Sequence, residues 1–203
     1  LVLGVCDMQA EVARDLIEAG VAVHVFNQRS IDGILAMIEA VGRLVGAEDQ
    51  ALSLVAELEA TIDTVRAQAA LLPRRPRVYF EEWDEPQISA VRWVSELIGI
   101  AGGDDIFAER ACHPAAAQRI LADPLEVVRR APDLIVGSWC GKRFRPEHVA
   151  GRAGWAEVPA VRDGEMHELK SALILSPGPV AIREGLPALA AIIARWAART
   201  STE

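Results

Sequence analysis

The chain of 203 residues carries 29 acidic and 21 basic side chains, which gives a formal net charge of −8. This balance argues against a nucleic-acid backbone as partner, because phosphate binding needs clustered Lys and Arg. About half of the residues are apolar, yet charged residues interrupt every long apolar run, so we expect no membrane span. The length is sufficient for one large or two small α/β units with cores of their own.

The three cysteines, Cys6, Cys112 and Cys140, are far apart and form no C-x-x-C pair. This pattern fits neither a disulfide framework nor a structural zinc site. No signal peptide is visible, and the first five residues have the composition of the inside of a strand. We therefore expect that the native product continues upstream of Leu1.

The first 46 residues alternate strands with helices. Apolar runs at 1–5 and 21–26 predict two buried strands. Each is followed by a segment with an apolar stripe at helical spacing, and these segments end at Gly20 and Gly46. Ser30 is the expected N-cap of the second helix. The order strand, helix, strand, helix predicts parallel pairing in an α/β unit.

A long helix is predicted from about residue 48 to residue 72, a stretch without Gly or Pro. At about 1.5 Å per residue it is roughly 37 Å long, enough to join two lobes. The alternative is one more surface helix of a single domain. Pro73 and Pro76 end the segment.

The α/β alternation resumes after these prolines. Strands are predicted at 77–80, 134–136 and 166–169, a polar loop at 81–86, and helices near 91–101, 124–130 and 181–198. We therefore predict an α/β fold of two lobes. The first lobe, 1–46, is truncated at its N-terminus; the helix 47–72 joins it to the second lobe, 73–203.

Candidate binding residues follow the predicted strands, because ligands of open parallel sheets bind beyond the carboxyl ends of the strands. Trp83 lies between Glu82 and Asp84 and can stack on a flat ligand or meet a cationic one. Ser138 and Trp139 follow the next buried strand. The competing interpretation is a solvated acidic loop with tryptophans packed into the core.

Two further groups complete the expected site. Ile174 and Leu175 belong to an apolar loop, 171–179, which needs a cover such as a ligand, the other lobe or its own domain. In the first unit, Asp7, Gln28 and Arg29 follow strand ends and are expected to face the same cleft. Arg29 can pair with an anionic group or simply solvate a turn.

Catalytic signatures are missing from the sequence, which contains no Gly-rich phosphate loop, no G-x-S-x-G and no H-E-x-x-H. Cys140 precedes Gly141 and Lys142, so a thiol- or carboxylate-dependent hydrolase is the alternative from the enzyme class. The four histidines form no partner motif for this thiol. The chemistry favours binding over turnover, and we expect no metal site and no resident cofactor.

Four segments resemble class III periplasmic substrate-binding proteins, and in particular their cobalamin-binding subgroup. They read RVYFEEWDEPQIS, WVSELIGIAGGDDIF, APDLIVGSWCGKRF and KSALILSPGP. With the order lobe, long helix, lobe, the resemblance covers nearly the whole chain. It places the second lobe's ligand contacts at Trp83, Trp139 and residues 171–175.

The resemblance implies a non-catalytic receptor that holds a cobalamin-like corrinoid, haem or a ferric siderophore between its lobes. Such a receptor delivers its ligand to an ABC permease in the membrane and lies in the periplasm or tethered to the cell surface. A cytosolic cofactor- or metal-handling protein on the same fold is the alternative. The closing loop is apolar where related receptors often carry charged or aromatic groups, which leaves the choice of ligand open.

Overall fold

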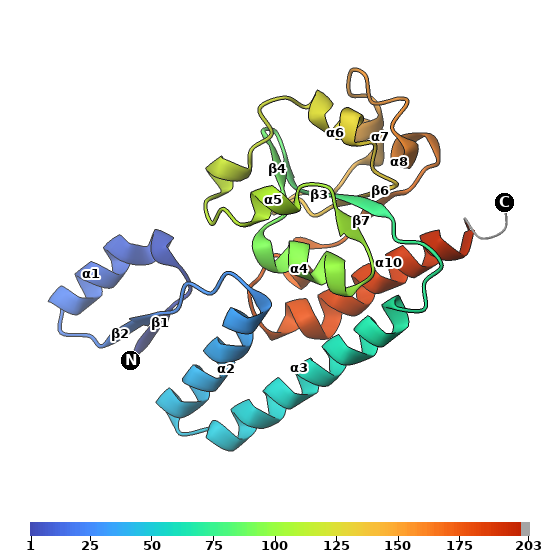
Figure 1. Ribbon diagram of the computed structural model, residues 1–203. Helices are drawn as coiled ribbons and strands as arrows, with labels where there is room; N and C mark the ends of the chain where they lie inside the picture. The colour runs from blue at the N-terminus through green and yellow to red at the C-terminus, as the bar shows by residue number, and fades with distance from the viewer. Residues whose placement is uncertain (200–203) are drawn as a thin grey trace.

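The computed structural model describes residues 1–199; residues 200–203, the end of the predicted second lobe, lie outside the described residues. A small unit made of β1 (Val2–Gly4), α1 (Ala10–Glu18) and β2 (Val23–Val25) stands at one end of the molecule (Figure 1). Two helices, α2 (Ile31–Val45) and α3 (Glu48–Ala69), connect this unit to a larger α/β body. The predicted α/β class is confirmed.

The two strands of the small unit pair in parallel, as predicted. A 3-10 turn, η1 (Asp7–Gln9), leads from β1 into α1. The prediction that these strands are buried is wrong: Leu1 and Leu3 are 63% and 40% exposed, and α1 buries no residue. The reason is geometric, since two short strands and one helix have too little neighbouring chain to cover both faces of the sheet.

The helix α2 begins and ends where the sequence predicts. Ser30 Oγ accepts a hydrogen bond from the Gly33 amide at 3.1 Å and caps the first turn. Gly46 follows the last turn in the left-handed conformation, with φ of 71°. After Gly46 the chain turns back and α3 runs alongside α2. The two helices are so close that a Cβ atom on Gly42 would lie 2.4 Å from the Cβ of Ala51.

The helix α3 is the predicted long helix, although it ends at Ala69 and not at residue 72. Its apolar stripe packs on α2 and on the terminal helix α10 (Leu186–Arg199), so α3 contacts both lobes. The buried residues recur three or four positions apart, as an amphipathic helix requires. They are Ala51, Val55, Leu58, Ile62 and Val65.

The second lobe is built on a five-stranded sheet in which β3 is central. It pairs in parallel with β6 and β5 and antiparallel with β4, and β7 lies beyond β6. The strands are β3 (Arg77–Asp84), β4 (Gln87–Ser89), β5 (Asp104–Asp105), β6 (Leu134–Gly137) and β7 (Met166–Glu168). The polar loop predicted at 81–86 is therefore wrong over its first four residues, which continue β3 and then turn into β4.

Short helices and turns connect these strands and cover the sheet. They are α4 (Arg92–Ile100), α5 (Ala108–Ala111), η2 (Ala116–Arg119), α6 (Leu125–Arg130), α7 (Pro146–Ala150), α8 (Pro159–Arg162), α9 (Ser171–Ile174) and a π-helical turn, η3 (Ala181–Gly185). Successive residues of β3 point to opposite faces. Val78 and Phe80 join a core with α3, α4 and α10, whereas Tyr79 joins a second core with Trp139 and Trp155.

Candidate functional site

A pocket of about 400 Å³ lies between the two lobes, at the strand ends where the sequence places the ligand. Residues that follow β1 and β2 form its first-lobe wall. Residues of β3, the start of α4, η2 and the loop after α9 form the opposite wall. Five of the ten predicted site residues line it: Asp7, Gln28, Arg29, Glu82 and Leu175.

The first-lobe wall is fixed by two polar contacts. Arg29 Nη2 donates to Asp7 Oδ1 at 2.7 Å, which joins the two strand-end segments. Gln28 Nε2 donates to the carbonyl of Pro177 at 2.8 Å, and this bond crosses from one lobe to the other. Asn27 turns the chain just before them, with φ of 58°, a left-handed conformation that Asn tolerates better than most residues.

The second-lobe wall contains a second ion pair. Arg119 Nη1 lies 2.6 Å from Glu82 Oε2 and also donates to the carbonyl of Ser89. Trp93 adds an aromatic surface at the start of α4. Because each arginine of the pocket is paired with a carboxylate, the formal charges of the lining residues cancel, and the pocket favours a ligand of mixed polarity.

The Trp83 side chain, on β3, lies outside this pocket. Trp83 is half-buried and donates Nε1–H to the carbonyl of Glu85 at 2.9 Å. Lys142 Nζ lies 4.2 Å from the centre of the Trp83 ring and 5.2 Å from that of Trp139, and it forms an ion pair with Asp84. A flat ligand can therefore stack on the Trp83 ring, at the position of Lys142, only after Lys142 leaves it.

Three other predicted residues are enclosed by the second lobe. Trp139 is 4% exposed and donates Nε1–H to Glu81 Oε1 at 3.0 Å. Ser138 is also buried. Ile174 lies in the core, where its carbonyl accepts a hydrogen bond from Trp93 Nε1 at 2.9 Å. The structure does not bring these side chains to the interlobe pocket.

A buried polar network explains why the acidic run at 81–85 is not simply solvated. The Glu81 carboxylate accepts two bonds from Arg152, at 2.6 and 2.9 Å, and one from Tyr79 Oη at 3.0 Å. Burial and the neighbouring Glu81 charge hold the pKa of Tyr79 well above its usual value. The network fixes the end of β3 from inside the protein.

Sequence reasoning missed the partner of Glu82. Arg119 is 3% exposed and sits in η2, within a run of small residues that carries no motif. The sequence analysis also does not predict Trp93 as a lining residue. Its position at the start of a predicted helix, two residues after Val91, is a signal that could have identified it.

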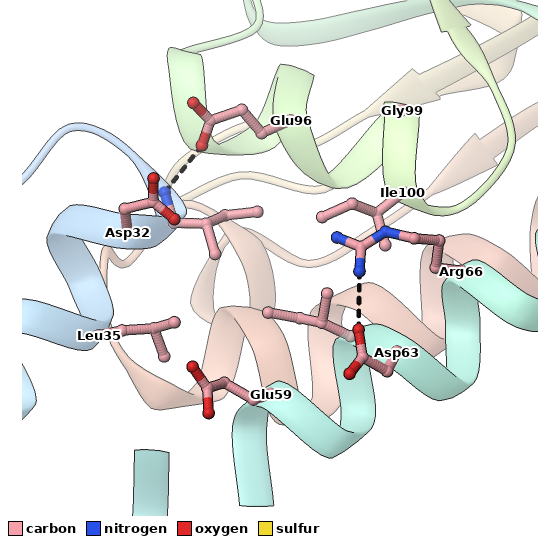
Figure 2. Close-up of a pocket in the computed structure, with 10 residues that line it drawn as sticks. Asp32, Leu35, Glu59, Asp63, Arg66, Glu96, Gly99 and Ile100 are labelled. Atoms are coloured by element: carbon pink, nitrogen blue, oxygen red, sulfur yellow. Dashed lines mark hydrogen bonds and ion pairs between the residues drawn. The ribbon is translucent and has the colours of Figure 1, made fainter. Parts of the chain in front are cut away.

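A groove of about 850 Å³ lies between α2, α3 and α4, away from the strand ends (Figure 2). Asp32, Glu59 and Glu96 line it together with apolar side chains. Glu96 Oε2 accepts a hydrogen bond from the Ile31 amide at 2.8 Å, so α4 of the second lobe caps the first turn of α2. The groove thus marks a contact between the lobes and lacks the strand ends that favour a ligand site.

Among residues 1–199, no group of three or more His, Cys, Asp or Glu side chains is placed to hold a metal ion. Within the same part of the chain, no helix is both long enough and apolar enough to cross a membrane. Cys6, Cys112 and Cys140 are free thiols.

Comparison with known proteins gives a family for the chain. The family model described as "Periplasmic binding protein" matches residues 1–173. An uncharacterized ABC transporter substrate-binding lipoprotein of Bacillus subtilis, YvrC, is 25% identical over 187 residues, which is 89% of this chain and 56% of that protein. The chain therefore spans little more than half the length of this curated relative.

Solved structures share the fold at low identity. An ABC transporter substrate-binding protein from Listeria monocytogenes superposes with a TM-score of 0.78 at 18% identity, covering 95% of this chain and 75% of that one. The periplasmic haem-binding protein RhuT from Roseiflexus gives 0.77 at 23%, covering 92% and 72%. The periplasmic vitamin B12-binding protein BtuF of Vibrio cholerae gives 0.67 at 18%, covering 96% and 71%.

These structures confirm the two-lobed fold, and the family model covers most of the sequence. The chain belongs to the periplasmic binding protein family, a family of solute receptors and not of enzymes.

Proposed function

We propose that the chain is the substrate-binding part of an ABC importer, which captures a cobalamin-like corrinoid or an iron complex between its lobes and delivers it to a permease. The observation that carries this proposal is the pocket at the strand ends, whose walls come from both lobes. Such a receptor works in the periplasm or tethered to the cell surface. It binds its solute as a ligand, carries no resident cofactor and leaves the solute unchanged.

The relatives support the ligand class. RhuT is named as haem-binding and BtuF as vitamin B12-binding, while the YvrC lipoprotein is named only by its transporter role. Haem and corrinoids are both large, flat metal complexes with polar groups on the rim. The pocket offers a matching mixture, with Trp93 and Leu175 beside charged and amide side chains.

The polar atoms of the pocket support a ligand with a polar rim. Gln28 Oε1, Arg29 Nε and Arg119 Nε are buried and have no hydrogen-bond partner among the described residues. A buried polar atom without a partner costs about 1–3 kcal/mol, so a ligand that supplies partners gains affinity. The carboxylates of haem can accept hydrogen bonds from Arg29 and Arg119. The side-chain amides of a corrinoid can accept from these arginines and can also donate to Gln28 Oε1.

Trp83 is proposed as a further contact of the bound state. Its ring is covered by Lys142 in the structure, and this lysine is 40% exposed and is held by its ion pair with Asp84. A flat ligand that displaces Lys142 gains the Trp83 ring as an aromatic surface. Replacing Trp83 with Phe then reduces ligand-induced quenching without abolishing binding.

The test is a titration of cyanocobalamin, haem and a ferric hydroxamate into the protein, followed by Trp fluorescence and thermal unfolding. We expect saturable quenching and a raised melting temperature for one of them. The variant Arg29→Met should bind about tenfold more weakly, because a charged hydrogen-bond donor is lost. Arg14→Met, which removes an arginine from the exposed pair with Asp15, is the matched control. Absence of binding by all three compounds would overturn the proposal.

A further inference from the structure

A second pocket, of about 600 Å³, lies at the carboxyl ends of β6 and β7, which are parallel neighbours in the sheet. Trp139 and residues 141–143, which follow β6, line it together with Glu168 and residues 170–172 at the end of β7. We call it the β6–β7 pocket. Because β3 runs parallel to β6 and its Glu82 lines the interlobe pocket, both pockets lie at the same edge of the sheet.

The short helix α9 connects the two pockets. Ser171 and Ala172 in its first turn line the β6–β7 pocket, and Leu175, which follows its last turn, lines the interlobe pocket. At about 1.5 Å per residue, these positions are roughly 5 Å apart along the helix. The interlobe pocket, with about 400 Å³, is small for a ligand site, since such sites span about 300–1,000 Å³. A solute too large for it can therefore continue into the β6–β7 pocket.

The β6–β7 pocket is lined by three cationic side chains and one carboxylate, although the chain as a whole is acidic. Lys142 is already paired with Asp84. Arg143 and Lys170 are exposed, and within residues 1–199 neither forms an ion pair. Glu168 provides the one negative charge against these two. A positive charge is therefore left over at this edge of the sheet, and it favours an anion.

The interlobe pocket has no such surplus of positive charge. Arg29 Nη2 and Arg119 Nη1 lie 2.7 and 2.6 Å from carboxylate oxygens. An anionic group that enters there meets carboxylates as well as guanidinium groups. Arg143 has no such partner and is open to solvent, and an arginine can bind a carboxylate through two parallel N–H donors.

The chain that carries Arg143 is fixed from within the second lobe. The next residue, Phe144, is 2% exposed, and its ring centre lies 5.0 Å from that of Trp139. The Phe144 amide donates to Glu168 Oε1 at 3.2 Å, which ties the segment after β6 to the end of β7. A charge presented from such an anchored segment loses less freedom when it binds a ligand than a charge on a loose loop.

We infer that the solute carries a free carboxylate, which binds to Arg143 and Lys170 while the rest of the solute occupies the interlobe pocket. The inference rests on the proposed function and narrows it. It selects anionic metal complexes over neutral corrinoids and over cationic ferric chelates, because only an anion gains from the unpaired charges of the β6–β7 pocket.

The test compares the affinities of five solutes for the whole protein by calorimetric titration. Haem and ferric citrate are anionic, whereas haem dimethyl ester, cyanocobalamin and ferrioxamine B carry no free carboxylate. Haem and its dimethyl ester differ only at the two carboxyl groups and form a matched pair. We expect one of the two anionic solutes to bind most tightly. Tightest binding by one of the other three would overturn the inference and leave the proposed function standing, whereas no binding by any of the five would overturn both.

Variants locate the effect in the β6–β7 pocket. Because both side chains are exposed, the double variant Arg143→Gln, Lys170→Gln should keep the native melting temperature and bind the anionic solute about fivefold more weakly. The double variant Arg14→Gln, Arg162→Gln makes the same change of net charge at exposed arginines outside both pockets, and should bind it as the native protein does. Glu168→Gln removes the opposing charge and should bind it about twofold more tightly. Unchanged affinity of the first double variant, or equal weakening by the second, would overturn the inference.

Discussion

Arg152 and Glu81 form a two-point ion pair inside the second lobe, with Nη1 2.6 Å from Oε2 and Nη2 2.9 Å from Oε1. Glu81 is fully buried and the Arg152 side chain is 17% exposed. Tyr79 and Trp139 donate to the same carboxylate. Since the next residue of β3, Glu82, lines the interlobe pocket, the pair fixes a wall of the site from behind.

Replacing Glu81 with Gln should destabilise the protein strongly. The amide keeps an acceptor but leaves the Arg152 guanidinium as an uncompensated, largely buried charge, and breaking such pairs costs about 3–5 kcal/mol. We expect the free energy of unfolding in urea to fall by about 3 kcal/mol. Glu59→Gln, on an exposed face of α3, should change it by less than about 0.5 kcal/mol. A loss below about 1 kcal/mol for Glu81→Gln would contradict the role given to the pair.

Tyr79 is the only tyrosine of the chain and therefore a specific optical reporter. Burial, followed by the Glu81 charge, raises its pKa above the ordinary value of 10.0. The folded protein then keeps this proton where the unfolded chain has lost it, so stability falls as pH rises above about 10. We expect tyrosinate absorbance to appear only together with the loss of circular dichroism. Tyr79→Phe should lose less stability over the same alkaline range. Tyrosinate absorbance that appears near the ordinary pKa of 10.0 without loss of circular dichroism would refute this account.

Asp105 provides a test on the acidic side. Burial raises its pKa above 3.8, although Oδ1 accepts a hydrogen bond from the Phe107 amide at 3.0 Å. Oδ2 has no partner among the described residues. The folded state retains the proton longer than the unfolded state, so Asp105 lowers stability as pH rises from about 4 through its folded pKa. Asp105→Asn should therefore gain stability relative to the native chain as pH rises from about 4 through the folded pKa of Asp105, measured by urea unfolding. A constant difference across this range would rule out the titration.

Glu96 tests the contact between the lobes. Its carboxylate caps α2 through the Ile31 amide, and removal of a helix cap costs about 1 kcal/mol. Glu96→Ala should lower the melting temperature, because the first turn of α2 loses its bond to the second lobe. Glu96→Gln retains an acceptor and should resemble the native protein. Equal behaviour of the two variants would show that the cap does not hold the lobes together.

The sequence predicts α2 and α3 well because their signals are local. Ser30, Gly46 and the apolar stripe of α3 each act within a few residues of where they stand. Buried Glu81 gives no such signal, since its partner Arg152 is 71 positions away. A run of acidic residues is normally solvated, and only the folded chain supplies the compensating charge.

The candidate site was predicted in part for a similar reason. The strand-end rule finds Arg29 and Glu82 without knowledge of the fold. The direction of the Trp83 side chain depends on β3 continuing past residue 80, because alternate residues of a strand point to opposite faces. Glu82 therefore faces the pocket, and Trp83 packs against the second core with Tyr79. A loop predicted at 81–86 has no such alternation, so the sequence analysis does not separate the direction of Glu82 from that of Trp83.

The close approach of Gly42 to Ala51 bears on how a solute enters. It packs α2 against α3, and α3 in turn packs against α10, so these helices and the second lobe form one continuously packed piece. Residues 1–26 join that piece through 27–30 and through the bond from Gln28 to Pro177. Entry of a solute into the interlobe pocket would require the bond between Gln28 and Pro177 to open, whereas the packing of α2, α3 and α10 can stay unchanged.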